Sequence, residues 1–149
     1  MTTSYVNFDG LTMPESGAPT VWKSTTGAGQ ILTATAGANN QLSDDYGGAP
    51  TLIGAGGDDT FNIVDPNTQV VETASTGTDT VNVWCNFDLP TNVNNLNLET
   101  ASTIGMGNSQ ADLMIALAAH DTLIAGTGED VLVDGGSGGE TFTLSLIHI

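Results

Sequence analysis

The sequence is almost without basic side chains. Lys23 is its sole Lys or Arg, against 17 Asp and Glu residues, so the formal net charge is −16 over 149 residues. Such a chain repels phosphates and anionic membranes, and we expect no nucleic-acid partner. The same charge opposes compaction of the chain, and bound divalent cations would relieve that repulsion.

Cysteines, long apolar runs and a secretory signal are also scarce or absent. Cys85 is the single cysteine, so no internal disulfide is possible, and we expect it to be a small buried apolar residue. No run approaches the roughly 18 apolar residues of a membrane span. The first residues have no basic start and no apolar run, which argues against a cleavable signal peptide.

The motifs of common enzyme classes are missing too. The sequence contains no H-E-x-x-H and no G-x-S-x-G, and His120 and His148 lack zinc-ligand spacing. We expect His120 to face solvent. The sequence therefore predicts that this chain is not an enzyme, while leaving open that it belongs to a larger secreted enzyme.

A short repeat dominates the C-terminal third of the chain. Asp112-Leu113-Met114, Asp121-Thr122-Leu123 and Asp130-Val131-Leu132 follow one another at nine-residue intervals, and Glu140-Thr141-Phe142 follows after ten. Glycines precede the later acids. A period this short predicts a β-solenoid whose tight loops bind calcium.

Together with residues 54–61, GAGGDDTF, these units resemble the haemolysin-type, or repeats-in-toxin (RTX), nonapeptide G-G-x-G-x-D-x-U-x, where U is a large apolar residue. The resemblance covers about residues 34–142. Ala55 and Ala125 replace glycines of the motif, and Glu140 replaces its Asp. The resemblance implies an all-β fold, a parallel β-roll or β-solenoid, with a strand-rich insertion between repeat blocks.

The residue types of the repeat suit calcium. Glycines allow tight turns with positive φ that point carbonyl oxygens inward, and the following Asp adds a carboxylate. Ca²⁺ takes six to eight such hard oxygen ligands, whereas Mg²⁺ prefers a smaller octahedron and keeps its waters. The candidate metal ligands are Gly57, Asp59, Asp112, Asp121, Gly126, Gly128, Asp130, Gly136, Gly138 and Glu140.

The resemblance also implies how these loops pair. Each ion would lie between loops two units apart, which pairs the Asp112 loop with the Asp130 loop and the Asp121 loop with the Glu140 loop. One nine-residue unit is then half a turn of the coil. The apolar residue after each acid would point inward, so that Met114, Leu123, Leu132 and Phe142 stack as a ladder.

The remaining sequence divides into a lead-in at residues 1–30, the RTX-like region at 31–142 with its insertion at about 60–104, and a tail at 143–149. The tail is either a truncation or read-through product or a final apolar strand. In the insertion, alternation predicts that Val81, Val83, Cys85 and Phe87 share a buried face.

Three smaller features leave alternatives open. Residues 109–120 have helical composition, but the nine-residue register favours strand and loop. Asp44 and Asp45 are metal ligands or, as we favour, solvated turn carboxylates. Trp22 either stacks on a sugar or, as we favour, covers an end of the core.

These observations predict a calcium-binding module whose folding is coupled to Ca²⁺. We expect an extracellular location after bacterial type I export, within a larger polypeptide. Two alternatives are a non-catalytic accessory tail of a secreted carbohydrate-active enzyme, which could bind polysaccharide, and an adhesin-like structural spacer with little affinity for metal.

Overall fold

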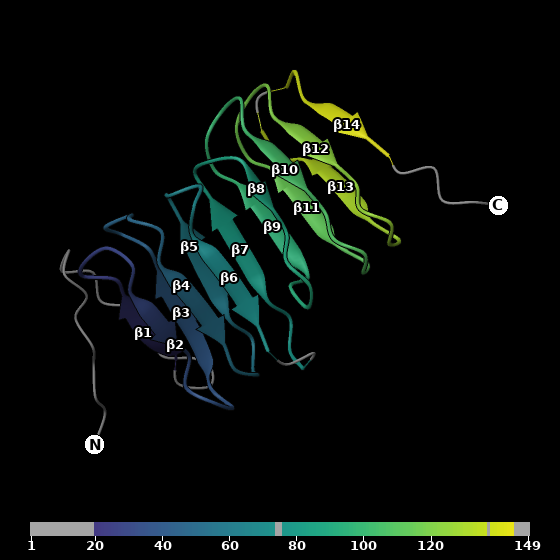
Figure 1. Cartoon of the computed structure of the whole chain (residues 1–149). Helices are drawn as coiled ribbons and strands as arrows, with labels where there is room; N and C mark the ends of the chain where they lie inside the picture. Colours follow the sequence, from purple (N-terminus) through teal and green to yellow (C-terminus); the bar gives the residue numbers. More distant parts are fainter. Residues whose placement is uncertain (1–19, 74–75, 137, 145–149) are drawn as a thin grey trace.

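Short parallel strands coil into an elongated stack in the computed structural model of the chain (Figure 1). The structure describes residues 20–73, 76–136 and 138–144, and none of these is helical. The strands are β1 (Thr20–Ser24), β2 (Ile31–Thr33), β3 (Asn39–Ser43), β4 (Thr51–Gly54), β5 (Thr60–Ile63), β6 (Gln69–Glu72), β7 (Thr80–Val83), β8 (Phe87–Asp88), β9 (Asn95–Leu98), β10 (Ile104–Met106), β11 (Leu113–Ala116), β12 (Thr122–Ile124), β13 (Val131–Asp134) and β14 (Thr141–Thr143).

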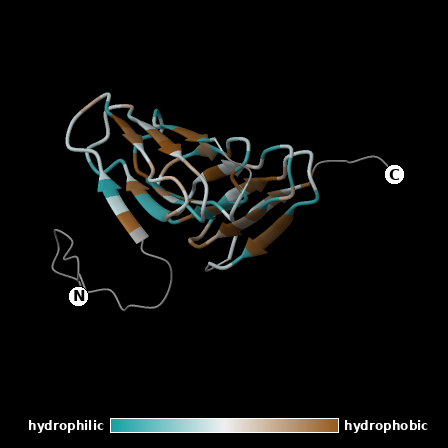
Figure 2. Ribbon diagram, turned by 90° about the horizontal axis from the view of Figure 1, so that it is seen from below, coloured by the Kyte–Doolittle hydropathy of each residue, from teal (hydrophilic) through white to brown (hydrophobic). Residues whose placement is uncertain are grey.

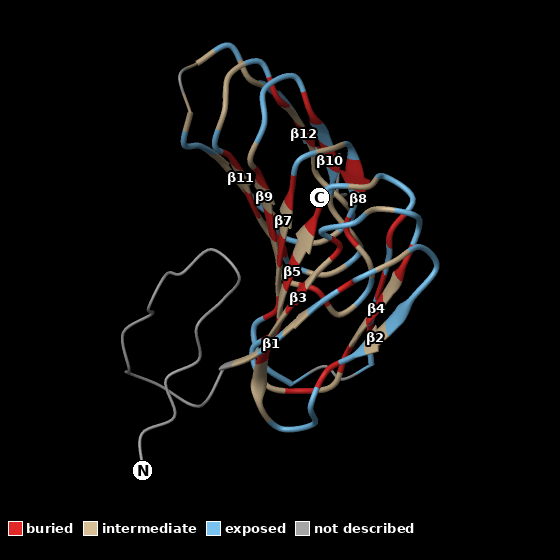
Figure 3. Cartoon of the chain, turned by 90° about the vertical axis from the view of Figure 1, so that its left-hand side faces the viewer, coloured by how far each residue is buried: buried red, intermediate tan, exposed pale blue. Residues whose placement is uncertain are grey.

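The strands form two facing walls. The odd-numbered strands make one seven-stranded parallel sheet, in the order β1-β3-β5-β7-β9-β11-β13. The even-numbered strands make two smaller sheets opposite it, β2-β4-β6 and β8-β10-β12-β14. Each turn of the coil contributes one strand to each wall, as Figure 3 shows from the side. The predicted fold class, an all-β parallel β-solenoid, is confirmed.

Strand register explains the nine-residue repeat. Leu113 pairs with Asn95 on one side and Val131 on the other, and Ile104 pairs with Thr122, so equivalent positions lie 18 residues apart. Nine residues are therefore half a turn. The pair Thr122 and Thr141 absorbs the one extra residue before Glu140.

The stretch expected as an insertion continues the same walls. Strands β5 to β9 lie within residues 60–104, and β5, β7 and β9 pair in the seven-stranded sheet. The turn length changes here, from 20 residues between Asp59 and Asp79 to 15 between Asp79 and Asn94. Irregular turn length hides the repeat in the sequence without breaking the coil. The opposite wall is interrupted at this point, because β6 and β8 belong to different sheets.

The solenoid also begins before residue 31. Strand β1 pairs with β3 along its whole length, with Trp22 opposite Gln41. Residues 1–19 and 145–149, where most of the expected lead-in and tail lie, are outside the described residues. Among the residues that are described, no helix has the length and apolarity to cross a membrane.

The core lies between the walls and is built by alternation along each strand. Leu42, Phe61, Val81, Leu96 and Met114 occupy paired inward positions in successive turns and are fully buried. Apolar residues, brown in Figure 2, accordingly concentrate in the strands. The predicted single ladder proves to be two columns, because half a turn moves a residue to the opposite wall: Met114 pairs with Leu132, and Leu123 pairs with Phe142.

Burial within these columns falls toward the last turn. Met114 and Leu123 have no exposed surface, Leu132 is partly buried, and Phe142 is 42% exposed, since no later turn covers it within the described residues.

One local prediction is confirmed in part and another in full. Val81, Val83 and Phe87 are buried as predicted, but Cys85, expected to be buried, is only partly so, and burial raises the pKa of its thiol. Residues 109–120 contain strand β11 and loops.

Candidate metal centres

A column of Asp and Asn residues runs along the seven-stranded sheet, at Asn40 in β3 and at the position just before each of β5, β7, β9, β11 and β13. At most steps the side chain in one turn accepts the backbone N–H of the turn before, whereas Asn94 N donates to the carbonyl oxygen of Asp79. Asn40 N donates to Asp59 Oδ1 at 2.9 Å, Asp59 N to Asp79 Oδ1 at 2.8 Å, and Asp112 N to Asp130 Oδ1 at 3.0 Å. The acid of the repeat thus has a structural role before any ion binds.

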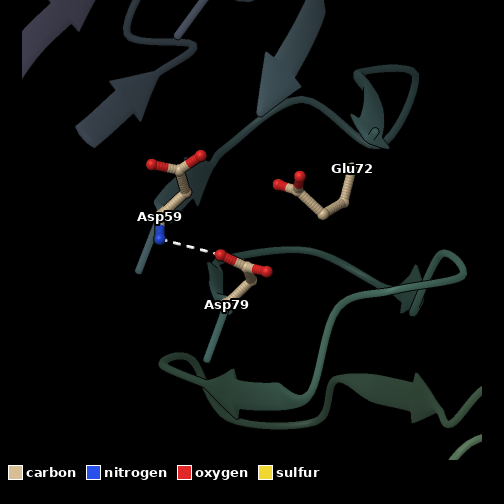
Figure 4. A group of neighbouring side chains, drawn as sticks. All are labelled: Asp59, Glu72 and Asp79. Atoms are coloured by element: carbon tan, nitrogen blue, oxygen red, sulfur yellow. Dashed lines mark hydrogen bonds between the residues drawn. The ribbon is translucent and has the colours of Figure 1, made fainter. Parts of the chain in front are cut away.

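Three acids of neighbouring turns meet beside this column, between β5, β6 and β7. Asp59, Glu72 and Asp79 are all buried, and each offers an oxygen within 4.8 Å of the others (Figure 4). Glu72 occupies an inward position of β6 beside Gly54, and a Cβ atom on Gly54 would lie 1.7 Å from Glu72 Oε2. The missing side chain at Gly54 therefore makes room for the Glu72 carboxylate.

Glu72 and Asp79 were not among the predicted ligands. Two signals point to them. In the segment Gln69-Val70-Val71-Glu72 the acid falls at the same parity as buried Val70, and Gly77-Thr78-Asp79 repeats the Gly-x-Asp pattern of the calcium loops. The alternation of buried and exposed positions along the strand would have identified Glu72.

The cluster is unfavourable as three isolated anions. Burial, and then the charges of Glu72, Asp59 and Asp58, raise the pKa of Asp79 to about 6. Buried charges are normally paired or coordinate a metal. The geometry is compatible with a metal ion held by three carboxylates, and it does not identify which ion.

A second arrangement lies where the loop at 107–112 stacks on the loop at 125–130. Asp112 Oδ2 accepts Asn108 N at 2.7 Å, but Asp112 Oδ1 and Asp130 Oδ2 are buried with no hydrogen-bond partner. Burial, and then the charge of Asp130, raises the pKa of Asp112 to about 6. Unsatisfied buried oxygens of this kind require an explanation, and a bound cation supplies one.

Glycines allow these two loops to stack closely. A Cβ atom on Gly126 would lie 1.5 Å from the carbonyl oxygen of Asn108, and one on Gly128 would lie 1.7 Å from that of Gln110. Backbone carbonyls and carboxylates of two turns are thus brought together. These are hard oxygen donors, the kind that calcium accepts.

A third arrangement lies on the opposite wall. Thr103 N donates to Asp121 Oδ1 at 2.8 Å, and strand register places Glu140 beside Asp121 in the next turn. Asp121 is fully buried, and neither Asp121 Oδ2 nor Glu140 Oε1 has a hydrogen-bond partner. The structure thus brings Asp121 and Glu140 into neighbouring turns, as it does Asp112 and Asp130.

The predicted glycines are placed less uniformly. Gly57 has φ +95° and lies against the Ala38 carbonyl, and Gly136 lies against that of Ala118. Gly138 has φ +92°, but a Cβ atom there would meet nothing within 4 Å. Gly57 belongs to the loop before Asp59 and is remote in sequence from the other predicted glycines.

Asp44 departs from its prediction. It is fully buried and accepts hydrogen bonds from Val64 N at 2.7 Å, Asp65 N at 3.0 Å and Thr68 Oγ1 at 2.5 Å. The prediction that Asp44 is a solvated turn carboxylate is wrong, because the following turn folds over its side chain. Asp45, in contrast, is exposed and accepts a hydrogen bond from Ser24 Oγ at 2.5 Å.

Comparisons with known proteins extend these observations. The chain, which forms a parallel β-solenoid with columns of buried acids, is similar in sequence to two proteins of Rhizobium meliloti (strain 1021). It is 33% identical over 114 residues to endo-1,3-1,4-beta-glycanase EglC and 34% identical over 115 residues to endo-1,3-1,4-beta-glycanase ExsH. These stretches cover 76% and 77% of this chain, and the chain spans about a quarter, 24%, of each relative.

Two comparisons gave nothing. No family model matches the chain, so the RTX resemblance stays a prediction. No solved structure matches it.

The relatives correct one expectation. The prediction that the chain is not an enzyme is overturned, because both relatives are named as enzymes that act on a β-glycan. Both names belong to proteins of which this chain spans 24%, so a search of this chain for enzyme motifs samples only part of such a protein.

Proposed function

We propose that this chain is the calcium-binding β-solenoid region of an endo-β-glycanase that acts outside the cell. The observation that carries the proposal is the similarity, over three quarters of the chain, to two proteins named endo-1,3-1,4-beta-glycanases. Within the proposal, the calcium-binding region spans about residues 31–142 and belongs to a larger polypeptide.

Calcium is the second part of the proposal and depends on separate evidence. Asp112 with Asp130, and Asp121 with Glu140, present buried carboxylate oxygens that lack hydrogen-bond partners. Asp59, Glu72 and Asp79 supply a third set of buried acids, with oxygens that lie within 4.8 Å of one another. When bound, calcium would neutralise these acids and join consecutive turns, so that its binding free energy adds to folding.

Calcium also suits an exported protein. At low cytosolic calcium the acidic turns repel one another and the coil is least stable, which would favour type I export. Millimolar calcium outside the cell then stabilises the closed coil. In this proposal the solenoid is most stable where the enzyme works.

The glycanase proposal is tested on the complete polypeptide that contains the chain. We expect it to release new reducing ends from mixed-linkage β-1,3-1,4-glucan, and to release none from an unrelated α-glucan. A complete polypeptide that leaves β-glucan intact would contradict the proposal, whatever its behaviour with calcium.

The calcium proposal is tested on the 149-residue chain after treatment with chelator. Calorimetric titration with Ca²⁺ should give saturable heat, and Mg²⁺ at the same concentration should not. At a free calcium concentration 100 times the Kd, each site adds about 2.7 kcal/mol to the free energy of unfolding, which raises the Tm by roughly 5–10 °C.

Two neighbouring variants sharpen this test. Asp130→Asn should lose part of the calcium heat, because Asp130 Oδ2 is one of the unpartnered oxygens. Glu129→Gln is the matched control, since Glu129 is the adjacent residue and its side chain is exposed. Absence of calcium heat in the unmodified chain would instead favour a structural spacer.

A further inference from the structure

The outward face of the seven-stranded sheet carries a second polar column. Ser43, Asn62, Asn82 and Asn97 occupy paired outward positions in four consecutive turns, and we call them the asparagine ladder. Asn62 Nδ2 donates to Ser43 Oγ at 3.1 Å, Asn82 Nδ2 to Asn62 Oδ1 at 2.9 Å, and Asn97 Nδ2 to Asn82 Oδ1 at 2.9 Å. These bonds fix the orientation of each amide.

The ladder does not exhaust its hydrogen-bonding capacity. A primary amide has two N–H donors and an oxygen with two lone pairs. Each of Asn62 and Asn82 uses one donor and one lone pair within the ladder. A second donor and a second lone pair remain on each, in a row that follows the solenoid axis at the strand spacing of about 4.8 Å.

A groove of about 430 Å³ lies along this face. Its lining consists of Gln41, Ser43, Asp45, Asn62, Val64 and Trp84. Strand register explains why they meet: Asn62 lies beside Ser43, and Val64 and Trp84 each follow the end of a paired strand, β5 and β7. Trp84 is 44% exposed, so one part of its indole is packed and another is free to contact a ligand.

We propose that this groove binds a neutral polysaccharide chain, of the β-glucan class that the proposed function implies. The indole of Trp84 supplies an apolar surface for the C–H face of a sugar ring. The amides of Gln41 and Asn62, the Ser43 hydroxyl and the Asp45 carboxylate supply donors and acceptors for sugar hydroxyls.

The negative charge of the chain selects against anionic polymers. The chain carries a net charge of −16, and the one Lys of the sequence, Lys23, donates its side-chain hydrogen bond to the backbone oxygen of Thr33. An anionic polysaccharide would be repelled from the groove, whereas a neutral glucan would not. This reasoning deepens the proposed function and rests on it for the choice of glucan.

Binding is tested with the full 149-residue chain in calcium buffer, by retardation in gels containing mixed-linkage β-1,3-1,4-glucan and by titration with a soluble oligosaccharide of that glucan. We expect Trp84→Ala to weaken binding about tenfold, equivalent to ~1.4 kcal/mol, and Trp84→Phe to weaken it less. Circular dichroism and the Tm of each variant confirm that it remains folded.

Trp22→Ala is the matched control. Trp22 is 43% exposed and lies on the outward face of the same sheet, but it does not line the groove. We expect its replacement to leave binding within about twofold. An equal loss from both tryptophan variants, no retardation of the unmodified chain, or equal retardation by the anionic polymer alginate would each overturn the proposal.

The outcome is separable from the proposed function. Hydrolysis is measured on the complete polypeptide, and calcium heat does not involve Trp84. If the 149-residue chain is retained by glucan and Trp84→Ala abolishes that retention, but the complete polypeptide hydrolyses no glucan, the groove proposal stands and the glycanase proposal fails. If the complete polypeptide hydrolyses glucan but the 149-residue chain is not retained, the glycanase proposal stands and the groove proposal fails.

Discussion

Replacing Phe61 by alanine is expected to lower the free energy of unfolding by about 3–5 kcal/mol, as for other buried aromatic residues. Phe61 is fully buried on β5, and its paired neighbours in the adjacent turns are Leu42 and Val81. In a solenoid each turn contacts mainly its neighbours, so a cavity here weakens two interfaces at once. Urea unfolding in calcium buffer, followed by circular dichroism, measures the change.

Val71→Ala is the control for this variant. Val71 lies on β6 at an outward position and is 41% exposed, so its truncation removes little buried surface and should change stability by about 0.5 kcal/mol or less. Equal losses in the two variants would mean that Phe61 does not lie in a continuous core.

The regular part of the coil was predictable because its period is visible in the sequence. Between β9 and β13 each turn has 18 residues, so an acid, a small residue and an apolar residue recur at fixed intervals. That interval sets the half-turn, the strand positions and the neighbouring placement of Asp112 and Asp130. A repeat of this kind needs no long-range information.

The earlier turns were harder to predict from the sequence. Their length varies between 15 and 20 residues, so Glu72 and Asp79 share no fixed interval with Asp59. Only the pairing of β4 with β6 and of β5 with β7 brings the three acids together. Asp44 was misjudged for a related reason, because the backbone that covers it comes from the next turn, at Val64 and Asp65.

The Asp column suggests why an acid, and not only an asparagine, occupies this position. Asn94 in the column accepts the N–H of Asp79 as well as a carboxylate does. Joining turns therefore needs one oxygen and no charge. Where the sequence retains Asp, as at Asp112 and Asp130, a second oxygen and a negative charge remain for another partner. A divalent cation uses both.

The second large effect concerns pH. In chelator, the chain is expected to have a Tm roughly 5–10 °C higher at pH 5 than at pH 7.5. The folded-state pKa values of Asp79 and Asp112 are raised from 3.8 to about 6, mainly by burial. Between these values the folded chain binds more protons than the unfolded chain, so stability falls as the pH rises through that window.

Asp65 does not offset this trend. Hydrogen bonds, chiefly from the backbone of Asn67 and Ala49, lower its pKa from 3.8 to about 2. Its contribution is present above the unfolded pKa and is lost only as the pH falls toward 2, so it is constant between pH 5 and 7.5. Thermal melts in chelator at these two pH values therefore report mainly on Asp79 and Asp112.

Calcium and a single substitution distinguish this explanation from a general effect of acidity. Calcium binds the ionised carboxylates, so millimolar calcium should shrink or reverse the difference between pH 5 and pH 7.5. Asp79→Asn keeps the oxygen that accepts Asp59 N but removes one charge from the cluster, so in chelator it should stabilise the chain at pH 7.5 and reduce the pH dependence. Glu129→Gln removes one charge from an exposed position and should leave the pH dependence unchanged. A Tm that rises from pH 5 to pH 7.5 in chelator would show that the buried acids are satisfied without a cation, and the case for calcium between the turns would fail with it.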